Sequence, residues 1–220
     1  CTYHNGKDIG NLDIRRIINI PWYKKLEAGP SYHMFYLDFL LLIKTLKIAL
    51  SDKYDIIYAH LHEGALIGWI VKLFTRKKLI FDCQDSLIKE LEAHDFSKKN
   101  SLFRKFMWFF EKLAYNKSDL IVTSTTGMKK FLEENGINKE IVVVEDGVNT
   151  DFFNPNARKA NLDLPKNKKI VVYLGGLQKY KGIDYLLKAI PYTSKKFHFL
   201  IMGYPEVERC KKIVEELGVS

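Results

Sequence analysis

Cysteine is scarce in this sequence, and its spacing excludes two classes of protein. The 220 residues include 3 cysteines, Cys1, Cys83 and Cys210, which lie far apart. Without a Cys-x-x-Cys pair, a zinc ribbon and a disulfide-stapled scaffold are both excluded. Widely spaced free cysteines are typical of a reducing compartment, so we expect a cytoplasmic protein.

A membrane-spanning segment is also missing. Such a segment needs about 20 consecutive apolar residues. The longest candidate, Tyr36 to Leu50, is interrupted by Asp38, Lys44 and Lys47. The sequence therefore predicts that no segment is integral to a membrane. The chain starts without methionine and stops where a further strand is expected, so we expect a fragment of a longer protein.

Signatures of nucleic-acid binding are absent too, although the charge would permit such binding. The net charge is +9, from 35 Lys and Arg against 26 Asp and Glu. A positive surface favours phosphate-bearing partners in general. Because no RNA-binding or helix-turn-helix motif occurs, we expect no nucleic-acid partner, which leaves a nucleotide or an acidic lipid.

The sequence does contain a regular alternation of short apolar runs and longer amphipathic runs. The apolar runs predict buried parallel strands, and the amphipathic runs predict helices that cover them. This order is typical of a doubly wound α/β fold of Rossmann type. The expected strands are 55–60, 78–82, 119–123, 141–144, 170–174 and 197–202, and the expected helices are 34–50, 64–74, 102–116, 126–135, 183–194 and 207–217.

A polar, proline-punctuated stretch interrupts this alternation at residues 154–167. Such a stretch predicts a linker between domains. We therefore expect a Rossmann-like domain over 1–155, a linker over 156–167, and the beginning of a second Rossmann-like domain over 168–220.

The junction at Gly175 and Gly176 is a candidate ligand site. An apolar β-branched run ends at these glycines, and an amphipathic helix follows from Ile183. Glycines let the backbone turn tightly, and a helix N-terminus favours anions. Lys181 lies just before the N-terminus of this helix, so the sequence predicts a binding site for a phosphate-bearing ligand.

Two segments resemble a known family. Residues 146–153, Asp-Gly-Val-Asn-Thr-Asp-Phe-Phe, resemble the Asn-Gly-Val-Asp-x-x-x-Phe segment of family 4 glycosyltransferases, which have the GT-B fold. Residues 173–182, Tyr-Leu-Gly-Gly-Leu-Gln-Lys-Tyr-Lys-Gly, resemble the family's Tyr-x-Gly-Arg-Leu-x-x-x-Lys-Gly segment. Residues 111–124 are also similar to the helix and strand that lead to the last units of the family's first domain. The order and separation of the two motifs make the resemblance far stronger than either alone.

The resemblance implies a nucleotide-sugar donor held mainly by the second domain, and transfer with retention of anomeric configuration. It implies that Lys181 pairs with the donor diphosphate, which the backbone of Gly175 and Gly176 approaches, at the helix that Gly182 precedes. Gly176 stands where the family usually has arginine, so one cationic contact is missing. The family's Glu-x7-Glu pair would lie downstream of the residues present. The nucleotide sugar is a substrate, and the resemblance implies no metal or other cofactor.

Polar residues after the strand 78–82 are candidates for catalysis. Gln84 and Asp85 follow this strand, and the resemblance places Gln84 where the family often has a histidine that touches the transferred sugar. Glutamine can form hydrogen bonds but cannot exchange a proton near neutral pH. The alternative is that Asp85 and Ser86 cap a helix that begins at Leu87.

A second group of polar residues lies at the end of the strand 55–60 and consists of His60, His62 and Glu63. Residues two apart on an extended strand face the same way, so we expect His60 and His62 to share a face. Two imidazoles could bind a metal, but no third ligand is evident. A role in an acceptor cleft, or in capping a helix, is therefore favoured.

The expected helix over 102–116 has two different faces. The apolar stripe is expected to pack on the sheet, and the charged residues, with Trp108 among them, to form the solvated face. Residues 98–117 hold six basic residues against one acid, a pattern suited to an anionic membrane surface. The stripe consists of Phe103, Phe106, Met107, Phe110 and Ala114, and the charged face of Arg104, Lys105, Glu111 and Lys112.

These observations favour a nucleotide-sugar-dependent glycosyltransferase with a glycan or lipid-linked acceptor, working on the cytoplasmic side of a membrane. Its main electrostatic task is to stabilise the leaving nucleotide diphosphate. The alternative is a non-catalytic GT-B-like partner subunit of a glycosyltransferase complex, suggested by Gly176 and Gln84. A dehydrogenase is disfavoured because no Gly-x-Gly-x-x-Gly follows an early strand.

Overall fold

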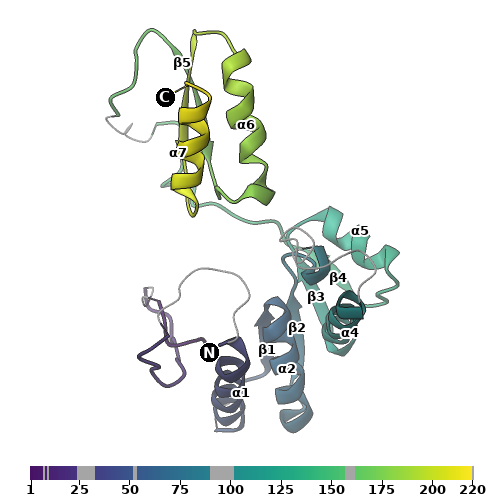
Figure 1. Ribbon diagram of the computed structural model, residues 1–220. Helices are drawn as coiled ribbons and strands as arrows, with labels where there is room; N and C mark the ends of the chain where they lie inside the picture. The colour runs from purple at the N-terminus through teal and green to yellow at the C-terminus, as the bar shows by residue number, and fades with distance from the viewer. Residues whose placement is uncertain are drawn as a thin grey trace. The chain divides into compact units, whose positions relative to one another are not determined.

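The computed structural model describes residues 1–6, 8, 10–23, 33–51, 54–89, 102–156 and 162–219 (Figure 1). They form two compact units, Cys1–Gly147 and Val148–Ser220. Each unit has its own parallel sheet and its own hydrophobic core. The boundary follows Gly147, so residues 148–155, which we expected in the first domain, group with the second unit.

The first unit contains a four-stranded parallel sheet in the order β1, β2, β3, β4. Its short runs of branched apolar residues form strands because side chains of this kind pack well on a pleated surface. The expected α/β alternation is confirmed. The elements are α1 (Met34–Ser51), β1 (Ile56–His60), α2 (Leu61–Thr75), β2 (Lys78–Asp82), α4 (Leu102–Lys117), β3 (Leu120–Thr123), α5 (Thr126–Glu134) and β4 (Ile141–Val143).

The core of the first unit lies between this sheet and its helices. Leu79 and Phe81 of β2 and Ile121 of β3 are fully buried, together with Tyr115 of α4 and Leu132 of α5. Central strands are covered on both faces in folds of this kind, so their inward residues lose all exposure. The sheet therefore forms a rigid base for the polar residues at its carboxyl edge.

The turn from β1 into α2 is tighter than the sequence indicates. We expected the helix from Gly64, but α2 begins at Leu61, directly after the last residue of β1. Leu61 has a φ of 60°, in the left-handed region that side chains other than glycine rarely adopt. This turn moves His62 off the strand and into the helix.

The second unit is built on two parallel strands. β5 (Lys169–Leu174) pairs with β6 (Phe197–Met202) along their whole lengths. The helices are α6 (Ile183–Ala189) and α7 (Val207–Glu216), with short 3-10 turns η1 (Lys179–Lys181) and η2 (Ile190–Tyr192). The helix expected over 183–194 is shorter because Pro191 lacks an N–H and clashes with the preceding turn. Leu177, Ile183, Leu187 and Cys210 form the buried core.

None of the helices that the structure describes combines the length and hydrophobicity of a transmembrane span.

Candidate active site

One buried carboxylate organises the carboxyl edge of β1 and β2. Asp82 ends β2 and is paired in register with His60, which ends β1. Its Oδ2 accepts from the Tyr58 hydroxyl at 3.2 Å and lies 3.0 Å from His60 Nδ1, and its Oδ1 accepts from Gln84 Nε2 at 2.5 Å. Asp82 is only 5% exposed. Three polar side chains thus converge on a carboxylate that water barely reaches.

The predicted catalytic pair, Gln84 and Asp85, lies in the exposed turn after β2. Gln84 reaches back to Asp82, as described above, whereas Asp85 Oδ1 accepts from the N–H of Ser86 at 2.8 Å. Ser86 Oγ accepts from the N–H of Lys89 at 3.4 Å, the pattern of a helix N-cap. The structure therefore contains the capping contact at Ser86, and Gln84 stays within the polar cluster at the strand ends.

His60 and His62 do not share a face, so the geometry expected for this pair is wrong. His60 remains on the strand, and its side chain is 67% exposed. His62 lies in the first turn of α2 and is buried, with Nε2 3.3 Å from the Tyr115 hydroxyl. Burial disfavours the imidazolium and lowers the pKa of His62 to about 4. The reason is the turn at Leu61, directly after the strand. Side chains two residues apart share a face in a strand but not in a helix, and His62 already belongs to the helix.

Glu63 is the third predicted acceptor residue, and it lies beside His62 in the first turn of α2. An acidic side chain there complements the positive end of the helix dipole. Within the described residues, no cluster of three or more His, Cys, Asp or Glu side chains is arranged to hold a metal ion.

Glu111 is the centre of a buried hydrogen-bond cluster. We expected this residue on the solvated face of α4, and that prediction is wrong. It is fully buried. Its Oε1 accepts from the N–H of Leu87 at 3.1 Å and from the Tyr115 hydroxyl at 2.7 Å, and its Oε2 accepts from the N–H of Ile88 at 3.1 Å. Burial raises the pKa of Glu111, although these hydrogen bonds act in the opposite direction. Glu111 thus caps the helical turn that follows the Gln84 loop.

The face assignment of α4 is therefore wrong for Trp108, Phe103 and Phe106 as well, whereas Lys105 is exposed and Ala114 is buried as expected. Trp108 packs on the core and lies edge-on to the Phe131 ring, with 6.5 Å between centroids. Phe103 and Phe106, which we expected in the core, are 46% and 55% exposed, and Phe109 is 62% exposed. The inward face carries residues at spacings of three and four, namely Trp108, Glu111, Tyr115 and Ser118. This periodicity in the sequence could have indicated which face is buried. Lys98 and Lys99 of the predicted basic segment lie outside the described residues.

The predicted donor-binding loop connects β5 to α6 in the second unit. The N–H of Gly175 donates to the Met202 carbonyl at 3.1 Å, and the N–H of Gly182 donates to the Lys179 carbonyl at 3.1 Å. These two amides are therefore engaged within the fold. Because α6 has only 7 residues, its dipole is weak. The charge of Lys181 is the main feature that the loop offers to an anion.

Lys181 is exposed, and its Nζ lies 5.1 Å from the centre of the Tyr180 ring. Among the described residues, no carboxylate forms an ion pair with it. Arg209 is the arginine tied to this loop, through its bond to the Leu177 carbonyl at 2.6 Å. Asp184 and Glu206 both pair with Arg209, so its charge is already compensated.

Gly176 stands where the resemblance expects arginine, and a neighbouring side chain fills the space beside it. A Cβ at position 176 would lie 2.2 Å from Gln178 Oε1. This oxygen is buried and has no hydrogen-bond partner within the described residues. The Tyr173 hydroxyl fixes the turn by donating to the Gly176 carbonyl at 2.7 Å. A side chain at position 176 would therefore have to displace the Gln178 amide.

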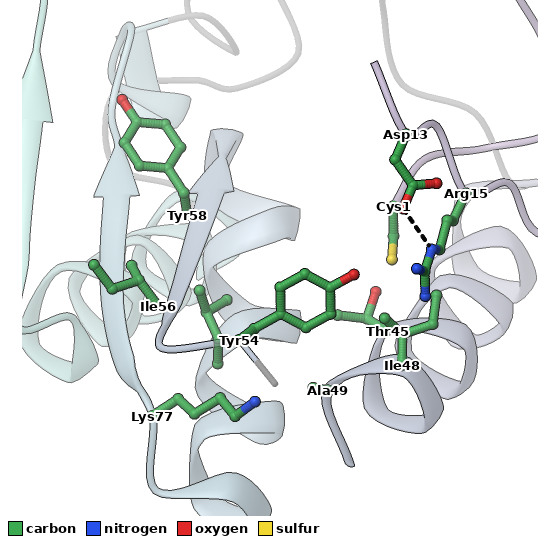
Figure 2. Close-up of a pocket in the computed structure, with 11 residues that line it drawn as sticks. Cys1, Asp13, Arg15, Thr45, Ile48, Ala49, Tyr54, Ile56, Tyr58 and Lys77 are labelled. Carbon is green, nitrogen blue, oxygen red and sulfur yellow. Dashed lines mark hydrogen bonds and ion pairs between the residues drawn. The ribbon is translucent and has the colours of Figure 1, made fainter. Parts of the chain in front are cut away.

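A cavity of about 240 Å³ in the first unit lies elsewhere (Figure 2). Figure 2 shows Tyr54 and Lys77 on one side of it and Cys1, Asp13 and Arg15 on the other. Tyr54 and Lys77 precede β1 and β2, so this part of the lining lies at the amino ends of the strands. Ligands of open parallel sheets bind at the carboxyl ends, so we assign the site to the Asp82 edge.

Comparison with known proteins decides the family. The family model described as Glycosyltransferase Family 4 matches residues 8–152, and that described as Glycosyl transferases group 1 matches residues 155–220. This chain belongs to glycosyltransferase family 4. An uncharacterised glycosyltransferase of Methanocaldococcus jannaschii is 26% identical over 93% of this chain and 49% of its own length. The chain spans about half the length of the curated relatives it matches.

Solved structures establish the GT-B fold of this family 4 chain. Sucrose-phosphate synthase from Thermosynechococcus elongatus matches with a TM-score of 0.75 and 16% identity, over 93% of this chain and 52% of that one. Anabaena HepE in complex with UDP and glucose matches with a TM-score of 0.67 and 16% identity, over 94% and 53%. At such identities the likeness shows the fold, and the GT-B expectation is confirmed.

Proposed function

We propose that the protein carrying this chain transfers a sugar from a nucleotide-sugar donor to a glycan or lipid-linked acceptor, with retention of anomeric configuration. Membership of a glycosyltransferase family supports the reaction class. The nucleotide sugar is a substrate, and the proposed reaction needs no separate cofactor. The second unit contributes the donor-side residues Gly175, Gly176, Lys181 and Gly182, and the first unit contributes the acceptor side.

The observation that carries the donor proposal is the cation at the β5–α6 junction. A solved protein of the same fold holds UDP and glucose, and in this chain Lys181, which no described carboxylate pairs with, offers a positive charge beside a glycine turn. A lysine binds phosphate as a compact point charge, and charged hydrogen bonds of this kind contribute about 1.5 to 3 kcal/mol. The charge would also stabilise the leaving diphosphate as it develops.

UDP binding by titration calorimetry tests this proposal, with GDP in parallel to define the base. Lys181→Ala should weaken binding by about 10- to 100-fold. Lys188→Ala is the matched control, because Lys188 is an exposed lysine in the last turn of α6, the helix that follows Lys181. Equal affinities for wild type and Lys181→Ala would refute the donor site. The anomeric configuration of the product, read by proton NMR, tests retention.

We also propose that α4 rests on an anionic membrane surface at the cytoplasmic side. Leu102, Phe106 and Phe109 are 83%, 55% and 62% exposed on its first half, and the exposed Lys105 lies among them. Exposed aromatic side chains next to basic ones suit a surface of anionic headgroups over an apolar interior. A lipid-linked acceptor would be found at the same surface.

Sedimentation with vesicles of phosphatidylglycerol tests the membrane proposal, with phosphatidylcholine vesicles as the neutral comparison. Replacing Phe106 and Phe109 by serine should weaken binding roughly tenfold or more, since each buried Phe contributes about 1.5 to 3 kcal/mol. Phe74→Ser in α2 is the control, because Phe74 is 65% exposed on another helix. If Phe74→Ser weakens binding as much, α4 has no special role.

A further inference from the structure

The group around Asp82 has a chemical property that identifies its ligand. A carboxylate only accepts hydrogen bonds, so the groups that face it must be donors. His60 therefore presents its Nδ1–H to Asp82, and Gln84 presents its amide nitrogen. In the neutral imidazole the other nitrogen, Nε2, is then an acceptor. The Gln84 carbonyl oxygen is the acceptor end of its amide.

Both of these acceptor atoms belong to exposed side chains. The His60 side chain is 67% exposed, and Gln84 is exposed in the turn after β2. His60 Nε2 and Gln84 Oε1 have no hydrogen-bond partner among the residues that the structure describes. The site thus displays two hydrogen-bond acceptors, oriented by a buried carboxylate that takes up the donor end of each side chain.

Strand geometry fixes this arrangement. His60 and Asp82 are register partners on adjacent parallel strands, and Tyr58 lies two residues before His60 on the same face. The Tyr58 and His60 rings contact edge to face, with 5.3 Å between centroids. The Tyr58 hydroxyl also donates to Asp82, so the imidazole is held between the Tyr58 ring and the Asp82 carboxylate, 3.0 Å from its Nδ1.

We propose that His60 Nε2 and Gln84 Oε1 form a subsite for two hydroxyl groups of an uncharged sugar or polyol acceptor, positioned by Asp82. This inference rests on the proposed glycosyl transfer and names the chemistry of its acceptor end. Hydroxyls donate to both atoms, whereas a phosphate group brings only acceptors and a charge of the same sign as Asp82. The subsite therefore selects neutral hydroxylated groups over phosphorylated ones.

Acceptor kinetics with the protein that carries this chain test the proposal, with UDP-glucose as donor. The probes are methyl glucoside, methyl galactoside and methyl mannoside against glucose 6-phosphate. His60→Ala and Gln84→Met should each raise the acceptor KM by about 3- to 10-fold, the loss of one hydrogen bond. Both residues are exposed, so folding is not at risk. Asp55→Asn, a carboxylate before the other end of β1, should change nothing.

Donor hydrolysis to UDP and glucose separates this proposal from the proposed function, because water replaces the acceptor. Hydrolysis unchanged in His60→Ala, with a raised acceptor KM, supports the subsite. Unchanged acceptor KM, or better use of glucose 6-phosphate, overturns it. If wild type neither hydrolyses nor transfers the sugar of UDP- and GDP-sugar donors, the proposed function fails. In that case, saturation-transfer NMR of the methyl glycosides tests the subsite independently of catalysis. The signal should be weaker with His60→Ala than with wild type, and an equal signal would overturn the subsite.

Discussion

Burial of His62 makes the stability of the first unit depend on pH, and a substitution can isolate this effect. The folded-state pKa is about 4, against an ordinary value of 6.5. The unfolded chain therefore binds the proton more readily, so stability is complete above pH 6.5 and falls as pH drops toward 4. At about 1.4 kcal/mol per pH unit the full loss is roughly 3 kcal/mol, of which about 2 kcal/mol is reached at pH 5.

Urea unfolding at pH 7.5, 6 and 5 measures this loss in wild type and in His62→Gln. All 3 tryptophans, Trp22, Trp69 and Trp108, lie in Cys1–Gly147, so their fluorescence reports the first unit alone. Between pH 7.5 and 5 the wild type should lose about 2 kcal/mol more than His62→Gln. His33→Gln, at an exposed histidine of the same unit, should follow the wild type.

Glu111 acts on stability in the opposite direction, so the comparison between variants is essential. Its pKa is raised by burial, and its contribution is complete below the ordinary value and is lost as pH rises through the folded value. Since His62→Gln keeps Glu111, whose Oε1 lies 3.7 Å from His62 Nε2, the difference between the two proteins reports the histidine together with its contact to Glu111. Parallel loss of stability in wild type and His62→Gln would refute the assignment of His62 as a buried neutral group.

Two further substitutions test the packing around the candidate site. Glu111→Ala should destabilise the first unit by about 3 to 5 kcal/mol in the same unfolding assay, because it removes the acceptor of the Leu87 and Ile88 N–H groups and of the Tyr115 hydroxyl. A cost no larger than that of Glu133→Ala, at an exposed glutamate of α5, would contradict this role. Gly203→Ala would place a Cβ 1.8 Å from the Gly175 carbonyl oxygen, so hydrogen exchange should quicken in β5 and β6. Gly147→Ala, where the Cβ meets nothing within 4 Å, should leave exchange unchanged.

The strands could be predicted from the sequence, because they depend on local patterns. Runs such as 78–82 and 170–174 are short, apolar and β-branched, and their strands begin and end within one residue of the prediction. Gln84 and His60 were each expected at the carboxyl end of a strand, the edge where ligands of parallel sheets bind. The shared partner Asp82 follows from the register of β1 and β2, which the sequence does not specify.

The inward face of α4 could not be predicted, because its anchor is a contact with the backbone. Hydrophobicity alone places Phe106 inside and Glu111 outside. Glu111 is buried because Leu87 and Ile88, more than 20 residues earlier, direct their free N–H groups at it. The first N–H groups of a helical turn need acceptors from elsewhere in the chain. The sequence of α4 does not reveal that one of its side chains is such an acceptor. Similarly, the left-handed turn at Leu61 moved His62 from the expected strand face into the core.

Two buried carboxylates hold the Gln84 loop from opposite ends. Asp82 fixes the beginning of the loop through the side chain of Gln84, and Glu111 fixes its end through the N–H groups of Leu87 and Ile88. Exposed side chains recognise a ligand well only when a supporting layer restricts their orientation. Here the supporting layer consists of the buried carboxylates of Asp82 and Glu111. Substitution of Glu111 should therefore disturb acceptor recognition through Gln84 but not through His60, which depends on Asp82 and Tyr58.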